Sequence, residues 1–306
     1  MIMNFEQLKY FLTINKTSSF TKAAKELFIS QPHLSQSISK LEDELGVKLF
    51  NRTTHSVSLT NDGKVFLKYA SRINGDYVKL MEELEGDRKM NDRISVGIVT
   101  TFSDYGYSKM LDSFERSIKG LTINKIWGGS NLLLNKLLMA EIQACIIIAG
   151  EEQLKELDLK YEKICVDNLM LMLSKDNPLS EKEKIRLSDL IGEDVYIFSG
   201  SKNVDRTVGT ARVINDAFHE YGIYDMTFKT YSVVDESVHR ANSNEGIFFI
   251  LEGSSHLGVS FNNIIFRHLS PDLKVSMYLV SKKDYDHPLL KKLFTHALRS
   301  GYNGIR

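Results

Sequence analysis

Two short amphipathic helical patterns, separated by residues 28–30, constrain the fold of this chain more than any other feature. Apolar residues recur at helical spacing over residues 20–27 and again over 31–45. The neighbouring small residues Ala23 and Ala24 let another helix approach closely. We therefore expect a compact helix-turn-helix near the N-terminus.

The second helix of this pair leaves one face free for small hydrogen-bonding side chains. Its leucines and isoleucine form a single stripe, and Gly46 ends it. Pro32 fits the first turn, because its missing N–H would have no partner there. Gln and Ser can bond base edges and phosphates, and Lys neutralises phosphate. The DNA-contact candidates on this helix and at its start are Ser30, Gln31, Pro32, His33, Ser35, Gln36, Ser37 and Lys40.

A β-hairpin is expected after this helix. Val57 and Leu59 alternate with polar residues as in a short strand, and the segment before them would form the tip. A hairpin beside a recognition helix is a wing, which can reach a neighbouring groove or the DNA backbone. The DNA-contact candidates in this wing are Arg52, Thr53, Thr54 and His55.

The charge of the chain does not identify a partner. Lys and Arg together number 39, as do Asp and Glu, and residues 1–60 hold seven basic and five acidic side chains. Spacing and charge alone therefore leave open both a DNA reader and a protein-binding helical module.

Residues 19–63 also carry many particular residue types at fixed offsets. They are Ser19, Phe20, Ala23, Ala24, Leu27, Ser30, Gln31, Pro32, Ser35, Leu41, Glu42, Leu45, Gly46, Val47, Leu49, Phe50, Arg52, Leu59, Thr60 and Gly63. In these positions the chain resembles the N-terminal region of LysR-type transcriptional regulators. The resemblance implies a winged helix-turn-helix over residues 1–60, with the 31–45 helix in the major groove of DNA. It also makes His33 and Ser37, at positions that the family varies, candidates for sequence-specific readout.

A long helix is expected over residues 61–90, and it would link two domains. Its apolar residues recur in steps of three and four, as in a coiled-coil seam. The alternative is an amphipathic helix that packs on its own domain, but a span of some twenty-five residues without a break favours contact between subunits. The candidate dimerisation residues are Phe66, Tyr69, Ile73, Tyr77, Leu80 and Leu84.

From residue 91 onward, strand patterns alternate with helical ones, which predicts an α/β sheet. The segments on which this rests are 94–99, 110–114, 121–127, 131–139, 145–148, 169–173, 194–198, 207–221, 228–231, 234–241 and 246–251. The pattern resembles the two-lobed effector domain of the same family, which is similar to periplasmic solute-binding proteins. The resemblance implies an effector-binding domain over 91–306. Its lobe I would comprise residues 92–165 and 267–306, and its lobe II residues 166–266.

Several polar, hydroxyl-rich segments follow the predicted strands of this domain. Ligands of open α/β sheets sit beyond the carboxyl ends of strands, where helix N-termini favour anions. The alternative use of each Ser or Thr is to cap a helix. The candidate effector contacts, in a cleft between the lobes, are Thr100, Thr101, Ser130, Asn131, Ser199, Gly200 and Ser232.

Other features of the sequence limit the class of protein. The two cysteines, Cys145 and Cys165, argue against a disulfide framework and suit a reducing compartment. Cys145 opens an apolar run and should be buried, which leaves Cys165 as the one candidate redox sensor. No signal-peptide pattern or run of ~20 apolar residues occurs, so we expect a cytoplasmic protein with no membrane contact. No metal-ligand spacing, phosphate loop or nucleophile elbow occurs, so we expect no metal, no cofactor and no enzymatic activity.

Together these features predict a ligand-responsive DNA-binding regulator. It would have an N-terminal all-α winged helix-turn-helix, a long linker helix and a C-terminal α/β two-lobed effector domain. Its partners would be double-stranded promoter or operator DNA, a small-molecule effector such as a metabolite, and further copies of itself in a dimer or tetramer. The alternative is a cytoplasmic solute-binding or enzymatic α/β protein whose helical N-terminus binds protein.

Overall fold

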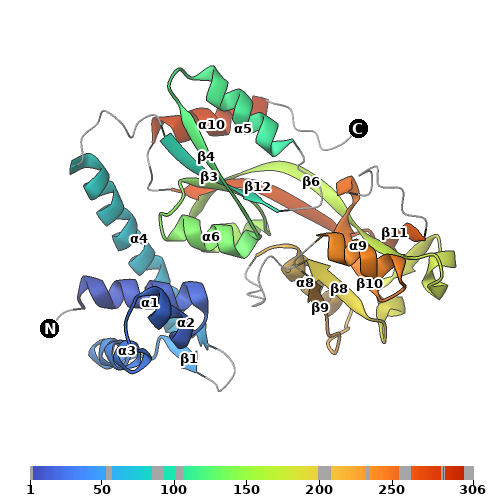
Figure 1. Cartoon of the computed structure of the whole chain (residues 1–306), viewed down its shortest axis with the longest axis horizontal. Helices are drawn as coiled ribbons and strands as arrows, with labels where there is room; N and C mark the ends of the chain where they lie inside the picture. Colours follow the sequence, from blue (N-terminus) through green and yellow to red (C-terminus); the bar gives the residue numbers. More distant parts are fainter. Residues whose placement is uncertain are drawn as a thin grey trace. The chain divides into compact units, whose positions relative to one another are not determined.

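The computed structural model (Figure 1) describes residues 3–52, 57–84, 93–100, 106–198, 208–231, 234–254, 263–283, 285 and 287–299. The chain divides into two compact units, one of residues 1–91 with 135–141 and one of residues 92–134 with 142–306. The sequence assigned all of 91–306 to one domain, so the short segment 135–141 is grouped differently in the structure. No helix in the described ranges is long and apolar enough to cross a membrane.

The first unit contains a helix-turn-helix followed by a hairpin. Its elements are α1 (Phe5–Thr17), α2 (Phe20–Glu26), α3 (Gln31–Leu45), β1 (Phe50–Arg52), β2 (Val57–Leu59) and α4 (Asn61–Leu84). The helix predicted over 31–45 is confirmed as α3. Ser30 caps its start by accepting the His33 N–H at 3.3 Å, and Gly46 ends it with a left-handed φ of 71°. Local signals therefore define both ends of this helix.

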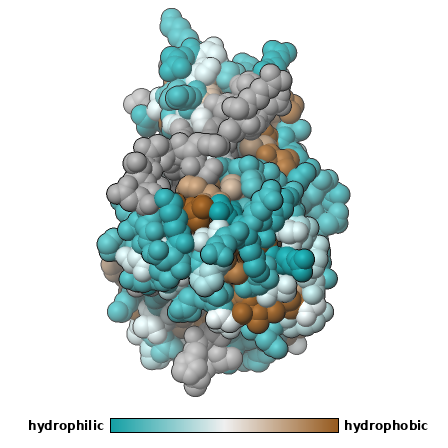
Figure 2. Space-filling model, turned by 90° about the vertical axis from the view of Figure 1, so that its right-hand side faces the viewer, coloured by the Kyte–Doolittle hydropathy of each residue, from teal (hydrophilic) through white to brown (hydrophobic). Residues whose placement is uncertain are grey.

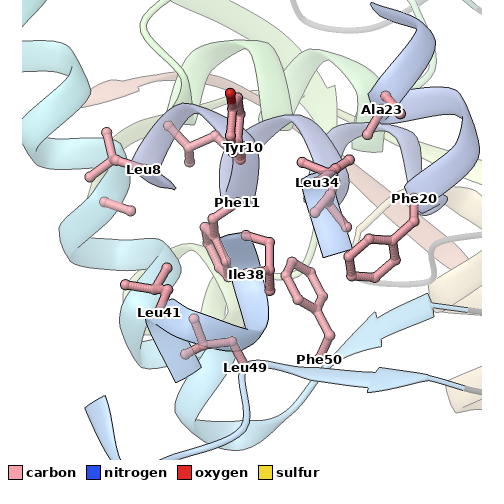
Figure 3. Packing of buried hydrophobic residues seen from close by; sticks show 14 of the residues in the cluster. Leu8, Tyr10, Phe11, Phe20, Ala23, Leu34, Ile38, Leu41, Leu49 and Phe50 are labelled. Atoms are coloured by element: carbon pink, nitrogen blue, oxygen red, sulfur yellow. The ribbon is translucent and has the colours of Figure 1, made fainter. Parts of the chain in front are cut away.

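One hydrophobic core holds these helices and the hairpin together (Figure 3). Leu34, Ile38 and Leu41 are fully buried along one side of α3, as the apolar stripe predicted. Phe11 of α1 lies among them, with its ring centroid 5.1 Å from that of Phe50 in β1. Burial of each such side chain contributes roughly 1.5–3 kcal/mol, so the core fixes which face of α3 stays outside.

The first turn of α4 is anchored closely to the hairpin. The Thr60 hydroxyl accepts the N–H of Gly63 at 2.9 Å and donates to the carbonyl of Lys48 at 2.5 Å. A Cβ atom at Gly63 would overlap the carbonyl oxygen of Leu49. This close approach of two backbones requires glycine.

The second unit is built on a mixed sheet that has ten strands in the described residues. They are β3 (Arg93–Val99), β4 (Thr122–Gly128), β5 (Ala144–Ile148), β6 (Leu159–Ser174), β7 (Lys184–Arg186), β8 (Val195–Phe198), β9 (Lys229–Tyr231), β10 (Ile247–Leu251), β11 (Ile264–Ser270) and β12 (Lys274–Lys282). The order is β4-β3-β5-β12-β6-β10-β8-β9, and β11 lies between β6 and β7.

The long strand β6 joins two halves of this sheet. Its residues 159–168 pair with β12, whereas residues from 169 onward pair with β10 and β11. The change of partner falls between Asn168 and Leu169, close to the predicted crossing at Cys165 and Val166. The chain returns at 271–273, between β11 and β12, where the Leu169 N–H donates to the carbonyl of Leu273 at 2.7 Å.

Helices cover both halves of the sheet (Figure 1). They are α5 (Tyr107–Ser117), α6 (Ser130–Leu138), α7 (Glu151–Glu156), α8 (Thr210–Glu220), α9 (Val234–Asn242) and α10 (Pro288–Arg299), with short 3₁₀ helices η1 (Pro178–Glu181), η2 (Leu187–Leu190) and η3 (Glu252–Ser254). α5 and α10 pack on one half, and α8 and α9 pack on the other. Figure 2 shows one face of the molecule as mostly hydrophilic, with hydrophobic residues in small separate patches.

Candidate functional site

The outer face of α3 carries a set of exposed polar side chains. Ser35 and Ser37 are half-buried. Acidic side chains are absent from the first turn of α3, where the N–H groups and the helix dipole favour anions. The DNA-contact candidates on α3 that are exposed are Gln31, Pro32, His33, Gln36 and Lys40. The first half of α3 thus offers hydrogen-bonding groups and a favourable dipole, and Lys40, further along the helix, adds a cation.

Arg52, also predicted to contact DNA, is held within the first unit. It is the last residue of β1, and its Nη1 donates to Ser35 Oγ at 3.2 Å while its Nη2 contacts Glu42 Oε2 at 3.2 Å. Its guanidinium also lies 4.6 Å from the centre of the Phe20 ring. About a third of the side chain remains exposed, at 33%. Arg52 therefore positions the hairpin against α3, and its freedom to contact a partner is limited by these bonds.

Glu42 is the residue of this region whose role the sequence did not reveal. Its side chain is only 2% exposed. Its Oε1 accepts the N–H groups of Leu49 and Phe50 at 2.9 and 3.2 Å, and its Oε2 lies 3.2 Å from Lys48 Nζ. A signal was present, because Glu42 lies four residues after Ile38 on the buried stripe, where an acid needs partners.

The other candidates of the wing, Thr53, Thr54 and His55, lie outside the described residues. Nothing in the structure tests their predicted role.

One face of α4 carries a row of exposed apolar side chains, of which Tyr77 also contacts Phe5 of α1 with the ring centroids 4.5 Å apart. Tyr69, Ile73, Tyr77 and Leu80 follow one another in steps of four, four and three, and each is between 43% and 57% exposed. Phe66, the first candidate of the seam, instead packs inward with its ring 4.7 Å from that of Phe11. Leu84 ends the helix, and its side chain is outside the described residues.

Three of the seven effector candidates fall in the described part of the second unit. Thr100 follows β3 and donates its N–H to the carbonyl of Gly128 at 2.8 Å. Ser130, at the start of α6, is buried and accepts the N–H of Ile148 at 3.0 Å. Its hydroxyl therefore fixes the end of β5. The candidates outside the described residues are Thr101, Ser199, Gly200 and Ser232.

Asn131 connects the two halves of the sheet. Its Nδ2 donates to the carbonyl of Val208 at 2.8 Å, and its Oδ1 accepts the N–H of the same residue at 3.0 Å. Asn131 belongs to α6 in the first half, whereas Val208 precedes α8, which packs on β8 in the second half. The amide thus bonds both backbone groups of Val208 and holds the halves together at this point.

The thiols and the metal-binding residue types offer no further chemistry in the described ranges. Burial raises the pKa of the Cys145 thiol, and burial is also the largest cause of the raised pKa of Cys165. Neither is therefore a ready thiolate at neutral pH. Among the described residues, no group of three His, Cys, Asp or Glu side chains could hold a metal ion.

Two protein-family models match this chain, one for each unit. Residues 5–64 match the family model of the bacterial regulatory helix-turn-helix protein, lysR family, and residues 87–301 match that of the LysR substrate binding domain. The chain is 31% identical to the malolactic fermentation system transcriptional activator of Lactococcus lactis subsp. lactis (strain IL1403), over 67% of this chain and 68% of that one. It is also 31% identical to the HTH-type transcriptional regulator YybE of Bacillus subtilis (strain 168), over 62% of this chain and 65% of that one, slightly under two thirds.

Solved structures share the fold. Full-length BenM gives a TM-score of 0.56 at 20% identity and covers 97% of this chain and 96% of its own. A full-length OxyR variant from Pseudomonas aeruginosa gives 0.51 at 20% identity and covers 98% and 95%. Because the two family models together span most of the sequence, this chain belongs to the LysR family of bacterial regulatory helix-turn-helix proteins.

Proposed function

We propose that this protein is a DNA-binding transcriptional regulator whose second unit binds a small-molecule effector. The observation that carries the proposal is the outer face of α3, where exposed hydrogen-bonding side chains surround a helix start without acidic residues. Such a face suits the major groove of DNA, and a protein-binding helix more often buries apolar side chains. We expect the protein to act in the cytoplasm, where that DNA would be, and to have no enzymatic activity.

The residues of α3 would divide the work of recognition. Gln36 can bond an adenine edge through both atoms of its amide, and His33 and Ser37 would read neighbouring bases. Lys40 would neutralise a phosphate, which raises affinity for any sequence and makes binding sensitive to salt. Arg52 and Ser35 bond each other, so we assign them mainly to positioning the wing. The wing tip, with Thr53, Thr54 and His55, would reach the backbone beside the groove.

The row of exposed apolar residues on α4 supports self-association. Tyr69, Ile73, Tyr77 and Leu80 would pack against the same row of a second copy, in the manner of a coiled-coil seam. The first unit would comprise a winged helix-turn-helix over 1–60 and a dimerisation helix over 61–90. A dimer would present two copies of α3, and symmetric copies read inverted half-sites about one helical turn apart or a multiple of that distance.

The second unit, over 91–306, would transmit the effector signal. An effector that binds one arrangement of the two halves more tightly shifts the population toward it, and the shift is limited by the difference in affinity. Thr100, Ser130 and Asn131 lie at helix starts and strand ends, and open α/β sheets in general bind ligands at such positions, which supports the proposal. In the described structure Ser130 and Asn131 also bond backbone groups, so an effector near them would compete with or reinforce those bonds.

Selection of bound sequences from random double-stranded DNA tests the proposal. The full chain should enrich an inverted repeat, since a dimer presents two reading helices. His33→Ala and Ser37→Ala should each relax the preference at particular positions of that repeat, while Lys40→Ala should weaken binding without changing the preferred sequence. Enrichment of no sequence, with the protein folded and in several salt concentrations, would refute the reading of α3 as a DNA-recognition helix.

A further inference from the structure

Phe28 combines an exposed apolar ring with a disfavoured backbone conformation, and neither stabilises the first unit. It lies in the turn between α2 and α3, and its side chain is 96% exposed. Its backbone is in the left-handed region with a φ of 57°, which is strained for a bulky residue. The chain thus places a large apolar ring in solvent at a position where its backbone is disfavoured.

The hydrogen bonds of this turn do not need the ring. The Phe28 N–H donates to the carbonyl of Lys25 at 3.2 Å, and the Ile29 N–H donates to that of Ala24 at 3.0 Å. This pair of bonds is a Schellman motif, in which the left-handed position is most often glycine. Ile29, the next residue, supplies the apolar packing onto the core that accompanies such a motif. Glycine at position 28 would therefore form the same turn with less strain.

The surroundings of Phe28 indicate what would cover it. It lies two residues before Ser30, the cap of α3, and so adjoins the exposed face assigned to DNA. Lys22 and Lys25 of α2 are exposed, and neither forms an ion pair among the described residues. Two exposed cations on the helix that leads into this turn match the border of a DNA groove, where phosphates lie next to sugars and thymine methyl groups.

We propose that Phe28 is a DNA contact of this protein, which places its ring against a deoxyribose or a thymine methyl at the border of the site read by α3. The inference rests on the proposed function, because it adds one apolar contact to the same interface. The contact would repay the strain of the turn only in the complex. Stability of the free protein and affinity for DNA should then respond to Phe28 in opposite directions.

The test uses the full chain and a DNA site obtained by selection. Phe28→Gly suits the left-handed backbone and removes the ring, and Phe28→Tyr keeps a ring. Tyr224→Ala removes another exposed aromatic ring, in the second unit, as a matched control.

We expect Phe28→Gly to raise the melting temperature of the first unit by about 2–5 °C. It should weaken DNA binding roughly five- to tenfold, with an unchanged salt dependence because no phosphate contact is lost. Phe28→Tyr and Tyr224→Ala should bind DNA like the unsubstituted chain.

Replacement of thymine by uracil in the selected site separates the two apolar partners. If the ring meets a thymine methyl, loss of that methyl weakens binding by the unsubstituted chain but not by Phe28→Gly; if it meets deoxyribose, both probes bind alike. Equal affinity of Phe28→Gly and the unsubstituted chain would overturn the inference while leaving the proposed function intact. A loss of both stability and affinity in Phe28→Gly would also overturn it, since the ring would then be structural. Failure of the unsubstituted chain to bind any DNA would refute the proposed function and this contact with it.

Discussion

Replacement of Glu42 should destabilise the first unit more than any exposed substitution on α3. In the structure this carboxylate is 2% exposed and accepts the backbone N–H groups of Leu49, just before β1, and Phe50, its first residue. It also contacts Arg52 and Lys48. Glu42→Ala leaves the two N–H groups without an acceptor and removes one of the partners of the Arg52 guanidinium. Glu42→Gln keeps an oxygen for the N–H groups and loses only the charge.

The magnitudes follow from these contacts. Each N–H left unsatisfied costs about 1–3 kcal/mol. The contacts with Arg52 and Lys48 add little, because Arg52 is a third exposed and Lys48 two thirds exposed, so that water screens both. We therefore expect Glu42→Ala to lower the free energy of unfolding of the first unit by about 3–5 kcal/mol. Glu42→Gln should cost about 1–2 kcal/mol, and the exposed control Glu44→Ala less than about 0.5 kcal/mol.

The position of the tryptophan makes the measurement selective. The chain has one Trp, Trp127, which lies in the second unit. Urea unfolding followed by Trp fluorescence should therefore keep its midpoint in all variants. Amide hydrogen exchange at residues 45–52, which reports on the first unit, should speed up strongly in Glu42→Ala and little in Glu44→Ala. Equal exchange in these two variants would refute the claim that the carboxylate fixes the hairpin to α3.

Four other substitutions or treatments have defined outcomes. Gly63→Ala should destabilise the first unit by about 1–3 kcal/mol, measured by helix unfolding in circular dichroism, because its Cβ would overlap the carbonyl of Leu49; an unchanged midpoint would contradict this. Ile73→Asp should shift the sedimenting species toward monomer by placing a charge in the α4 seam, and a persistent dimer would place the interface elsewhere. Asn131→Ala should lower the stability of the second unit by about 1–2 kcal/mol, seen by Trp fluorescence, because it removes two hydrogen bonds between the halves of the sheet; an unchanged midpoint would mean that these bonds contribute nothing. Cys145 in the native protein should resist alkylation at neutral pH, because burial raises its pKa; rapid labelling without unfolding would contradict its burial.

The sequence predicted α3 well because its signals are local. A first-turn proline, one apolar stripe and a terminal glycine all lie between residues 32 and 46, and the structure uses each of them. The cap at Ser30, which was expected only in the turn and as a DNA contact, was not predicted. The contacts of Arg52 could not be predicted in this way. Its partner Glu42 lies ten residues away across a turn, and spacing along a helix does not tell where a long side chain ends. Arg52 is thus exposed as expected, but its guanidinium is already bonded to Ser35 and Glu42.

The sheet shows the same limit on a larger scale. Within β6, the sequence indicated a strand only at 169–173, where both faces are buried. In residues 159–168 of the same strand, charged residues are mixed with apolar ones. This part forms a strand because it pairs with β12, more than a hundred positions later. The residues of β12, β11 and α10 were not predicted as strands or a helix. Ser130 and Asn131 were correctly placed at a helix start, but their bonds to Ile148 and Val208 depend on the assembled sheet.

The most direct test of the account measures affinity for a selected DNA site by fluorescence anisotropy at one fixed salt concentration. The full chain, Gln36→Ala and Glu44→Ala would be compared, since both substitutions lie on exposed positions of α3 and only the first removes a base-reading group. We expect Gln36→Ala to bind roughly 10–100 times more weakly, because it loses one two-point base contact. Glu44→Ala should bind at least as tightly as the unsubstituted chain. Equal affinities for all three proteins would contradict the central claim that the outer face of α3 reads DNA.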